Sequence, residues 1–348
     1  MDLHGKRDKR FISEFIPRVS RTFALAMKFL PPKLRHPVYT AYLLCRTADT
    51  IEDSPYFGAD EKRARLSRLQ RLLFDAGRGI TLAPDDIAPL YDSVNESNGY
   101  DQKLLGKSME LFGLLKRLPD EKQRIIYRWA GEMAGGMAEY ARGAADGRKT
   151  LLLLDDTDEW EKYCYYVAGT VGHMLTELWI DEYDFDPVLS AELKTLCNSF
   201  GLGLQKVNTI KDAPSDGKRG MIFLPGNIMR KHGLSLDSLM AASNQRAVSA
   251  FVHELAESAQ AHLDDAVQYT ALIPTRLKGV RMFLTVPIFL AAETLNAIRK
   301  YPVQTMIGPP VKITRRDVVR LTAAARKHSP SNDALRRYYL KLRRTTSS

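Results

Sequence analysis

Two pairs of aspartates in this chain have the residue type and spacing to bind a metal ion. Asp49 and Asp53 lie in the run Asp-Thr-Ile-Glu-Asp, and Asp212 and Asp216 repeat the four-residue spacing much later. Residues four apart share one face of a helix, so each pair brings like charges together and destabilises an isolated helix. A hard divalent cation bound to carboxylate and phosphate oxygens compensates for this repulsion. Either pair taken alone has a second interpretation, which is ordinary surface charge.

Basic residues lie beside both acidic pairs. Arg46 precedes Asp49 by three residues, and Lys211, Lys218 and Arg219 surround the second pair. Arginine and lysine donate charge-assisted hydrogen bonds to phosphate oxygens. Two acidic clusters with such neighbours could bind several Mg²⁺ ions together with one or two diphosphates. The ions would stabilise the diphosphate as a leaving group, and its departure would leave an allylic cation in an apolar cavity. The alternative role of the basic residues is charge balance with the neighbouring aspartates.

Helical periodicity predicts the elements that carry these side chains. Apolar residues recur at three- or four-residue spacing, and no sustained period-two alternation or fixed repeat is present. The predicted fold class is therefore all-α. The first apolar stripes are Leu66, Leu69, Leu72 and Leu73, then Leu104, Leu105, Phe112, Leu115 and Leu118. Further helices are expected over about 120–140, 158–182, 187–212, 236–269, 276–300 and 314–327, with turn-rich breaks at 54–60, 77–86, 213–220 and 304–310.

The composition is that of a soluble globular protein with a sizeable core. Hydrophobic residues make up 45% and charged residues 26% of the 348 positions, away from the disordered and disulfide-rich classes. Three cysteines without paired spacing predict buried thiols in the cytoplasm. No secretory signal is seen, and the longest apolar run, residues 282–292, is too short to span a bilayer. We therefore expect one cytoplasmic all-α domain over residues 1–348, with 1–15 and 330–348 peripheral or mobile.

The net charge of +10 favours a polyanionic partner, whether nucleic acid, anionic lipid or a diphosphate substrate. No zinc-finger or RNA-binding aromatic signature accompanies the basic residues, so nucleic acid is not expected. The tail from Arg336 to Arg344 suits peripheral association with an anionic membrane, on its inner face. A frayed, solvated helix end is an equally good interpretation of this tail.

Four ordered blocks of sequence resemble the squalene and phytoene synthase family. Ser20-Arg21-Thr22-Phe23 is similar to a flap that contacts diphosphate in the family, and residues 42–53 (YLLCRTADTIED) are similar to its first aspartate-rich motif. Residues 163–172 (YCYYVAGTVG) resemble a helix whose leading tyrosine acts in the first half-reaction, and residues 205–225 (QKVNTIKDAPSDGKRGMIFLP) resemble the second aspartate-rich motif. The likeness runs in blocks from about residue 20 to residue 314.

The resemblance implies a helical isoprenoid-synthase bundle with a central cavity and two molecules of farnesyl diphosphate as substrate. It implies Mg²⁺ ligands at Asp49, Asp53, Asp212 and Asp216. Catalytic roles are implied for Asp49, Asp53 and Asp212, for Tyr163 as proton acceptor or cation-stabilising hydroxyl, and for Phe283 as an aromatic shield of later cations. Diphosphate contacts are implied for Ser20, Arg21, Tyr42, Arg46, Lys211, Lys218 and Arg219. Without the resemblance, Tyr163 is interpreted as an ordinary core aromatic residue.

Several residues resemble the squalene-forming branch of the family. Gln205-Lys206-x-Asn208 and residues 283–287 are typical of that branch. Its Val-Lys-Ile-Arg segment, associated with NADPH, is matched here by residues 311–314 with the arginine displaced to Arg315. The resemblance therefore implies NADPH contacts at Asn208, Lys312 and Arg315, although no glycine-rich dinucleotide fingerprint is present.

The implied reaction joins two farnesyl diphosphates head to head to presqualene diphosphate and reduces this with NADPH to squalene. One alternative is a family member that stops at presqualene diphosphate or forms dehydrosqualene or phytoene without a reductant. Another is a non-catalytic basic helical scaffold that binds membranes or nucleic acid. Because eukaryotic members end in a membrane anchor that this chain lacks, a bacterial-type form is expected.

Two local features complete the expectations. Pro214 lies between the aspartates of the second pair, and proline disfavours the α conformation at the preceding residue. The helix is expected to end or kink there, so that Asp216 would reach a metal ion from a loop or only through water. His253-Glu254 and the segment from His262 to Asp265 lack a zinc-binding H-E-x-x-H spacing and are interpreted as a solvated helix face.

Overall fold

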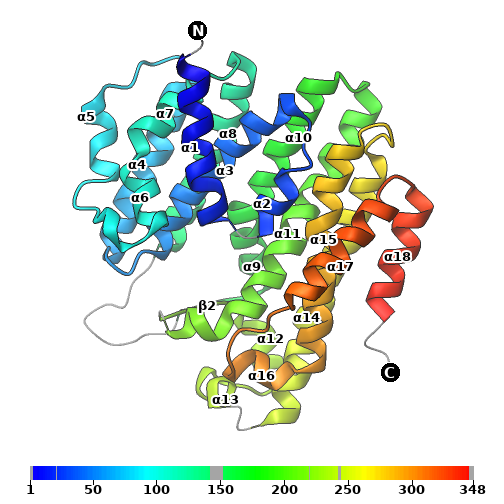
Figure 1. The fold of residues 1–348 in the computed structure, drawn as a ribbon. Helices are drawn as coiled ribbons and strands as arrows, with labels where there is room; N and C mark the ends of the chain where they lie inside the picture. Colours follow the sequence, from blue (N-terminus) through cyan, green and yellow to red (C-terminus); the bar gives the residue numbers. More distant parts are fainter. Residues whose placement is uncertain (1–2, 21, 142–151, 219, 242–243, 345–348) are drawn as a thin grey trace. The chain divides into compact units, whose positions relative to one another are not determined.

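The computed structural model describes residues 3–20, 22–141, 152–218, 220–241 and 244–344, and these residues are almost entirely helical (Figure 1). The all-α prediction is confirmed. The chain divides into two compact units. Unit 1 consists of Met1–Gly143 and His173–Ser190, and unit 2 consists of Ala144–Gly172 and Ala191–Ser348. The organisation of residues 1–348 as one domain stays a prediction.

Helix α3 (Pro32–Asp53) is the central functional helix of unit 1. It begins with Pro32 in the first turn, where a missing N–H is tolerated, and it ends before Ser54, whose α conformation is disfavoured by Pro55. One face of α3 is buried, with Leu43 and Leu44 at most 1% exposed. The acidic pair therefore lies at the C-terminal end of a helix that the core of unit 1 holds in place.

Helices α4 (Ala59–Gly77) and α8 (Asp120–Tyr140) of unit 1 pack closely against one another. A Cβ atom added at Gly131 would lie 2.6 Å from the Phe74 ring, so the glycine makes this approach sterically feasible. Both predicted leucine stripes are buried, the second being divided between α6 and α7. The other helices are α1 (Leu3–Val19), α2 (Thr22–Met27), α5 (Pro84–Ile87), α6 (Tyr100–Gly106), α7 (Ser108–Leu115) and most of α10 (Thr170–Tyr183), with 3-10 turns at Ala88–Leu90 and Glu96–Asn98.

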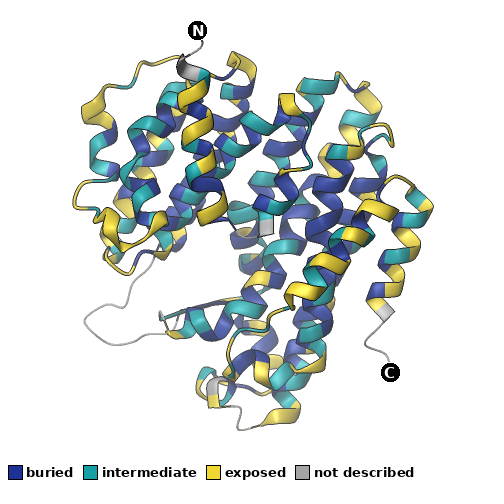
Figure 2. Cartoon of the chain, viewed as in Figure 1, coloured by how far each residue is buried: buried dark blue, intermediate teal, exposed yellow. Residues whose placement is uncertain are grey.

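Helix α15 (Lys278–Lys300) forms the core of unit 2. Its residues 280–292 are all buried (Figure 2), and α14 (Gln245–Leu272), α17 (Arg315–His328) and α18 (Asn332–Arg344) pack against it. In the described part of the chain, α15 is the one helix long and apolar enough to cross a membrane, yet 89% of its apolar window is buried. Its composition is thus explained by its place in the core of this unit.

Side-chain caps begin two of the remaining helices of unit 2. The Asp156 carboxylate accepts the amide of Glu159 at the start of α9 (Thr157–Cys164). The helix expected over 236–269 is two helices, α13 (Leu236–Ala241) and α14, and the Asn244 side chain caps the second by accepting from the amide of Ala247. The other elements are a π-helical turn (Tyr165–Gly169), α11 (Pro187–Lys218), α12 (Gly226–Lys231), α16 (Pro302–Ile307) and two parallel strands, β1 (Leu152–Leu154) and β2 (Met221–Pro225), with Leu152 opposite Met221.

Helix α11 does not end at Pro214, so the expectation that Asp216 lies on a loop is wrong. The helix continues to Lys218. Proline lacks the N–H that would bond to the carbonyl four residues earlier, and its ring crowds that carbonyl, but Pro214 is buried on the packed side of the helix. The last helical turn therefore survives, and Asp212 and Asp216 keep their four-residue spacing on one helical face.

Candidate active site

The first acidic pair lies in the last turn of α3, in unit 1. The Asp49 side chain is 31% exposed, and Nη1 of Arg46 lies 3.8 Å from its Oδ2. Burial raises the pKa of Asp49 to about 7, the Arg46 cation acts against this shift, and the Asp53 and Asp101 carboxylates reinforce it. A cation bound beside Asp49 would stabilise its charged form.

Arg46 is held in a fixed orientation by Asp101, a residue that sequence reasoning missed. Nε of Arg46 donates to Oδ1 of Asp101 and Nη2 donates to Oδ2, both at 2.9 Å. This is the bidentate geometry in which a guanidinium and a carboxylate bind most strongly. Asp101 lies in the first turn of α6, far from Arg46 in sequence, so no motif spacing indicates the pair. The contact leaves Nη1 directed toward Asp49.

Tyr42 and Ser20 lie near the same end of unit 1. The Tyr42 hydroxyl donates to the backbone oxygen of Val19 at 3.2 Å, and burial raises the pKa of Tyr42 to about 12. The Ser20 hydroxyl is buried and accepts the amide of Ala24 at 2.9 Å. Both hydroxyls thus fix the segment around Ser20, while Arg21 lies outside the described residues.

The second acidic pair lies in the last turns of α11, in unit 2. Nζ of Lys211 is 3.1 Å from Oδ2 of Asp212 and donates to Oδ1 of Asn208 at 3.3 Å. The Asp212 side chain is 38% exposed, whereas Asp216 is buried. The structure therefore brings Asn208, Lys211 and Asp212 together, with Lys211 balancing the charge of its neighbour. Lys218 is exposed at the end of the helix, and Arg219 lies outside the described residues.

Tyr163 is buried on α9 and stacks on Phe223 of β2. The two ring centroids are 4.2 Å apart and the ring planes differ by 7°. The chain continues directly into the π-helical turn, a feature that is frequent at functional sites. Phe283, the other predicted aromatic residue, is buried on α15. Both aromatic side chains belong to the core of unit 2.

Glycine is required after Tyr163 and at the facing position of α11, because a side chain there would clash with backbone atoms. A Cβ added at Gly172 would lie 2.2 Å from the backbone oxygen of Cys197. On the partner helix, a Cβ added at Gly201 would lie 2.2 Å from the backbone oxygen of Ala168. The segment that follows Tyr163 therefore contacts the backbone of α11 directly, which only glycine permits at these positions.

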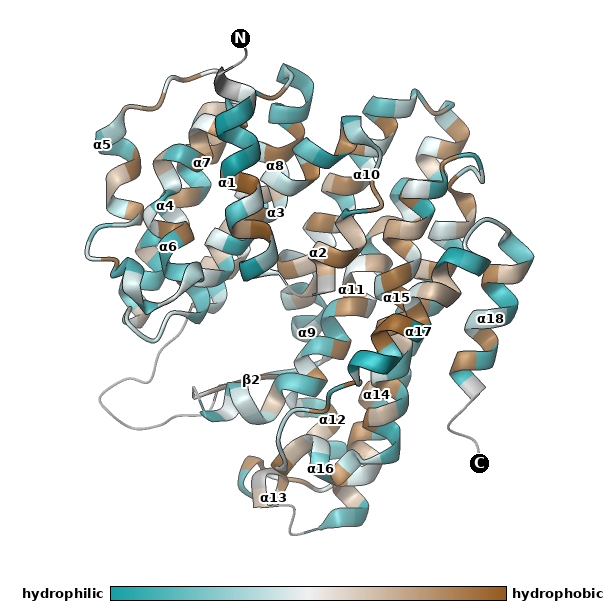
Figure 3. Cartoon of the chain, in the orientation of Figure 1, coloured by the Kyte–Doolittle hydropathy of each residue, from teal (hydrophilic) through white to brown (hydrophobic). Residues whose placement is uncertain are grey.

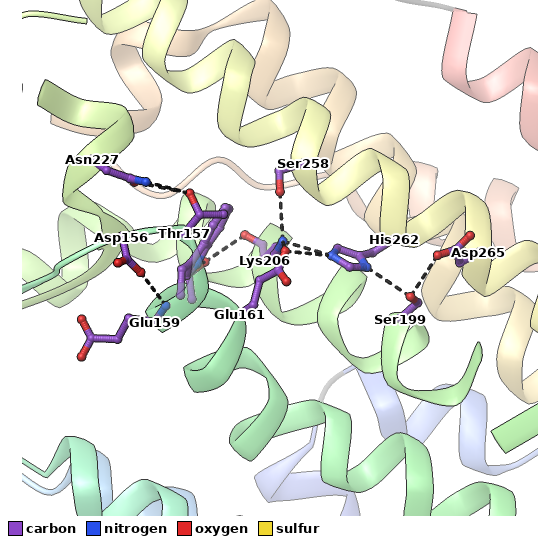
Figure 4. A network of polar contacts seen from close by, with 12 residues as sticks. Asp156, Thr157, Glu159, Glu161, Ser199, Lys206, Asn227, Ser258, His262 and Asp265 are labelled. Atoms are coloured by element: carbon purple, nitrogen blue, oxygen red, sulfur yellow. Dashed lines mark hydrogen bonds and ion pairs between the residues drawn. The ribbon is translucent and has the colours of Figure 1, made fainter. Parts of the chain in front are cut away.

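Lys206 lies at the centre of a buried polar network in unit 2 (Figure 4). Its side chain is 0% exposed. Nζ is 2.7 Å from Oε1 of Glu161, 2.9 Å from Oγ of Ser258 and 3.0 Å from Nε2 of His262. Three polar groups surround the three donors of the ammonium group, and the Trp160 ring lies 4.8 Å from Nζ. Lys206 thus ties α9, the helix of Tyr163, to α11 and α14.

His262 belongs to this network, so its interpretation as part of a solvated helix face is wrong. Its side chain is only 19% exposed. Nε2 of His262 lies 3.0 Å from Nζ of Lys206 and 3.4 Å from Oε1 of Glu161, and Nδ1 lies 3.2 Å from Oγ of Ser199. Ser199 in turn donates to Asp265 at 2.9 Å. Sequence gave no signal for the network, because its members come from three helices.

The three residues predicted to contact NADPH are all exposed in unit 2. Asn208 lies on α11, Lys312 precedes α17, and Arg315 begins α17. No hydrogen bond joins these three side chains within the described residues. A metal site made by protein alone is also absent there, since no three His, Cys, Asp or Glu side chains of the described segments converge. Each aspartate pair therefore offers two carboxylates at most.

Comparison with known proteins gives the family. A model of the squalene/phytoene synthase family matches residues 16–317. The chain belongs to this family. Squalene synthase of Cyberlindnera jadinii is 30% identical over 329 residues, covering 94% of this chain and 70% of that protein. Human squalene synthase is 28% identical over 308 residues, covering 88% of this chain and 67% of that protein.

Solved structures with a similar fold cover most of the chain. The structure of TcSQS with the ligand BPH1237 has a TM-score of 0.77 and 25% identity, covering 97% of this chain and 91% of that one. A dehydrosqualene synthase in complex with a ligand shares the fold, with a TM-score of 0.66 and 22% identity. The chain spans between 59% and 70% of the length of several squalene synthases that it matches. The predicted family is confirmed, and the chain is an enzyme of the prenyltransferase type.

Proposed function

We propose that this enzyme joins two farnesyl diphosphates head to head, through presqualene diphosphate, to squalene. One observation carries the proposal: the last turns of α3 hold Asp49, Asp53 and the clamped guanidinium of Arg46 together. Carboxylates for a divalent cation beside a fixed donor for phosphate suit a reaction whose first event is departure of diphosphate. The similarity to squalene synthases along most of the chain supports farnesyl diphosphate as substrate.

The residues of both aspartate pairs fit Mg²⁺. They offer oxygen donors, which this cation prefers, and the raised pKa of Asp49 reflects unfavourable charge that a cation would offset. We assign Asp49, Asp53, Asp212 and Asp216 as ligands, with diphosphate and water completing the coordination. When bound, Mg²⁺ would neutralise the charge that develops on the departing diphosphate. Asp49, Asp53 and Asp212 are thereby the carboxylates on which catalysis depends.

The chain's own residues would bind and orient the substrates. Ser20, Tyr42 and Arg46 of unit 1 suit one set of diphosphate oxygens, because hydroxyls and a guanidinium donate to phosphate. Lys211 and Lys218 of unit 2 offer ammonium donors beside the second aspartate pair. Arg21 is assigned to the first set of diphosphate-binding residues and Arg219 to the second, because each lies next to that set in the sequence.

Tyr163 would relay the proton released when the cyclopropane ring of presqualene diphosphate forms: its oxygen accepts that proton from carbon while its own proton passes to an oxygen of the departed diphosphate. Its burial against Phe223 keeps water away from the hydroxyl and leaves aromatic faces beside it. Aromatic faces stabilise cations, and Phe283 would do so later in the reaction. Lys206 acts as a positioning residue, because it fixes α9 without itself touching the substrate.

NADPH is the proposed reductant, held by Asn208, Lys312 and Arg315. One amide and two exposed cations suit the phosphates of a dinucleotide. NADPH would supply hydride to the last carbocation. The alternative is a non-reducing enzyme that releases presqualene diphosphate, dehydrosqualene or phytoene. The displacement of the arginine to Arg315 is the observation that motivates a direct test of this alternative.

We propose a cytoplasmic enzyme that works at the inner face of the membrane. Farnesyl chains and squalene are apolar, so substrate and product partition into lipid. The net charge of +10 suits anionic headgroups on that face.

The experiment for this proposal is product analysis. Purified enzyme is incubated with farnesyl diphosphate and Mg²⁺, with and without NADPH, and products are identified by mass spectrometry. Squalene that forms only with NADPH is the expected result. If dehydrosqualene forms or presqualene diphosphate accumulates in the presence of NADPH, the enzyme belongs to the non-reducing branch. If phytoene forms from geranylgeranyl diphosphate, that diphosphate is the substrate in place of farnesyl diphosphate.

A further inference from the structure

Most of the net positive charge of the chain is concentrated in α17 and α18. Residues 315–344 contain ten lysines and arginines and two aspartates, which gives +8, compared with +10 for the whole chain. The two helices belong to unit 2, where they pack against one another and against α15. A concentration of like charge on neighbouring helices produces a local potential of several kT.

The basic side chains share the outer faces of both helices. On α17 and α18 the inward residues Leu321, Ala325, Leu335 and Tyr339 are buried, whereas hydrophilic residues recur on the exposed side (Figure 3). We call the exposed set the α17–α18 surface. It consists of Arg315, Arg316, Val319, Arg320, Arg326, Lys327, Arg336, Arg337, Leu340, Lys341 and Arg343.

Acidic neighbours neutralise little of this surface. Arg320 pairs with Glu293 and Asp317, and Arg343 pairs with Asp264. In the segments that the structure describes, six basic members of the surface form no ion pair, which leaves their charge available to a partner. They are Arg315 at the start of α17, Arg316, Arg326, Lys327, Arg336 and Arg337.

Apolar side chains lie among these cations. Val319 is 70% exposed and Leu340 is 43% exposed. The aromatic residues of α18 are engaged inward, since Tyr338 stacks on His328 and Tyr339 bonds to Asp264. The surface thus offers cations and small apolar groups but no free aromatic platform on which bases stack. This combination suits lipid headgroups and the adjoining acyl region better than nucleic acid.

We propose that the α17–α18 surface is a docking surface for the anionic phospholipid headgroups of a membrane. The proposal does not rest on the proposed chemistry, because the surface and its charge exist whatever the product is. Binding of this kind is electrostatic, so it requires anionic lipid and weakens as salt is added. Each lysine or arginine near an anionic membrane strengthens binding about fivefold.

The test is cosedimentation of the full chain with vesicles. Vesicles of mixed phosphatidylglycerol and phosphatidylcholine are compared with vesicles of phosphatidylcholine alone, at low and high salt. We expect binding to the mixed vesicles at low salt, loss of binding at high salt, and little binding to phosphatidylcholine. The variant R326Q/K327Q/R336Q/R337Q should bind mixed vesicles several hundredfold more weakly, about fivefold for each of the four cations removed.

Two further variants separate the surface from net charge and from folding. The matched control R71Q/K116Q/K194Q/R246Q removes four exposed cations elsewhere and should bind mixed vesicles within about threefold of the unaltered chain. The variant R326K/R336K/R337K keeps the charge and should bind as the unaltered chain does. Thermal unfolding of each variant checks that the helices remain folded.

Three results would overturn the proposal. The first is equal binding to both kinds of vesicle. The second is an equal loss of binding in the α17–α18 variant and in the matched control. The third is tight binding of an RNA duplex, lost in the α17–α18 variant, with no binding to vesicles, which would make the surface a nucleic-acid site.

Discussion

Asp101 holds the guanidinium of Arg46 by two hydrogen bonds of 2.9 Å and leaves Nη1 of Arg46 3.8 Å from Asp49. Replacing Asp101 by asparagine keeps the size of the side chain but removes its charge and one acceptor. The guanidinium should then lose its fixed orientation toward the substrate. We expect the KM for farnesyl diphosphate to rise about tenfold, measured by steady-state kinetics. Asp60→Asn, which breaks the exposed Asp60–Arg63 pair, is the control and should leave KM unchanged.

Lys206→Met should destabilise unit 2, because it removes the contacts of Nζ with Ser258 and His262 and the ion pair with Glu161. Breaking a buried pair costs about 3 kcal/mol, and urea unfolding measures the loss. Lys231→Met removes the more exposed ion pair with Glu254 and should cost less than about 1 kcal/mol. Equal losses in the two variants would contradict the central position of Lys206.

The stability of the fold should depend on Glu161 at acid pH. Contacts with His262 and Lys206 lower the pKa of Glu161 from 4.5 to about 2, although burial acts in the other direction. Because the folded-state pKa is the lower one, the contact stabilises the fold above pH 4.5, and this contribution disappears as the pH falls to about 2. Urea midpoints of the unaltered chain and Glu161→Gln should differ most at neutral pH and converge toward pH 2. A constant difference across this range would refute the assignment.

Gly201→Ala should destabilise the contact between α11 and the segment after Tyr163. The added Cβ would lie 2.2 Å from the backbone oxygen of Ala168, and backbone cannot move aside as a flexible side chain can. We expect a loss of about 2 kcal/mol in urea unfolding. Gly77→Ala meets only an ordinary contact of 3.5 Å with Tyr127 and should be neutral. If Gly201→Ala and Gly77→Ala had equal free energies of unfolding, the close approach of α11 to the backbone of Ala168 would be contradicted.

The sequence predicted the helices and the residue types of the site, but not the side chains that hold the site residues. Periodicity is local, so α4, α8 and α15 were predictable from their apolar positions. Pairs such as Arg46–Asp101 and Lys206–His262 join distant helices, and no local pattern encodes them. The prediction for α11 was wrong at Pro214. Proline usually destabilises a helix interior, but the packing of the buried helix can stabilise it by more than this cost.

Replacing a proposed metal ligand tests whether the enzyme converts farnesyl diphosphate to presqualene diphosphate or squalene. The initial rate of conversion is measured for the unaltered enzyme, Asp49→Asn and Asp60→Asn, each with Mg²⁺ and with a chelator. We expect conversion by the unaltered enzyme and by Asp60→Asn with Mg²⁺ only, and a rate at least about a hundredfold lower for Asp49→Asn. Full activity of Asp49→Asn, or conversion by the unaltered enzyme in the chelator, would contradict the proposed function.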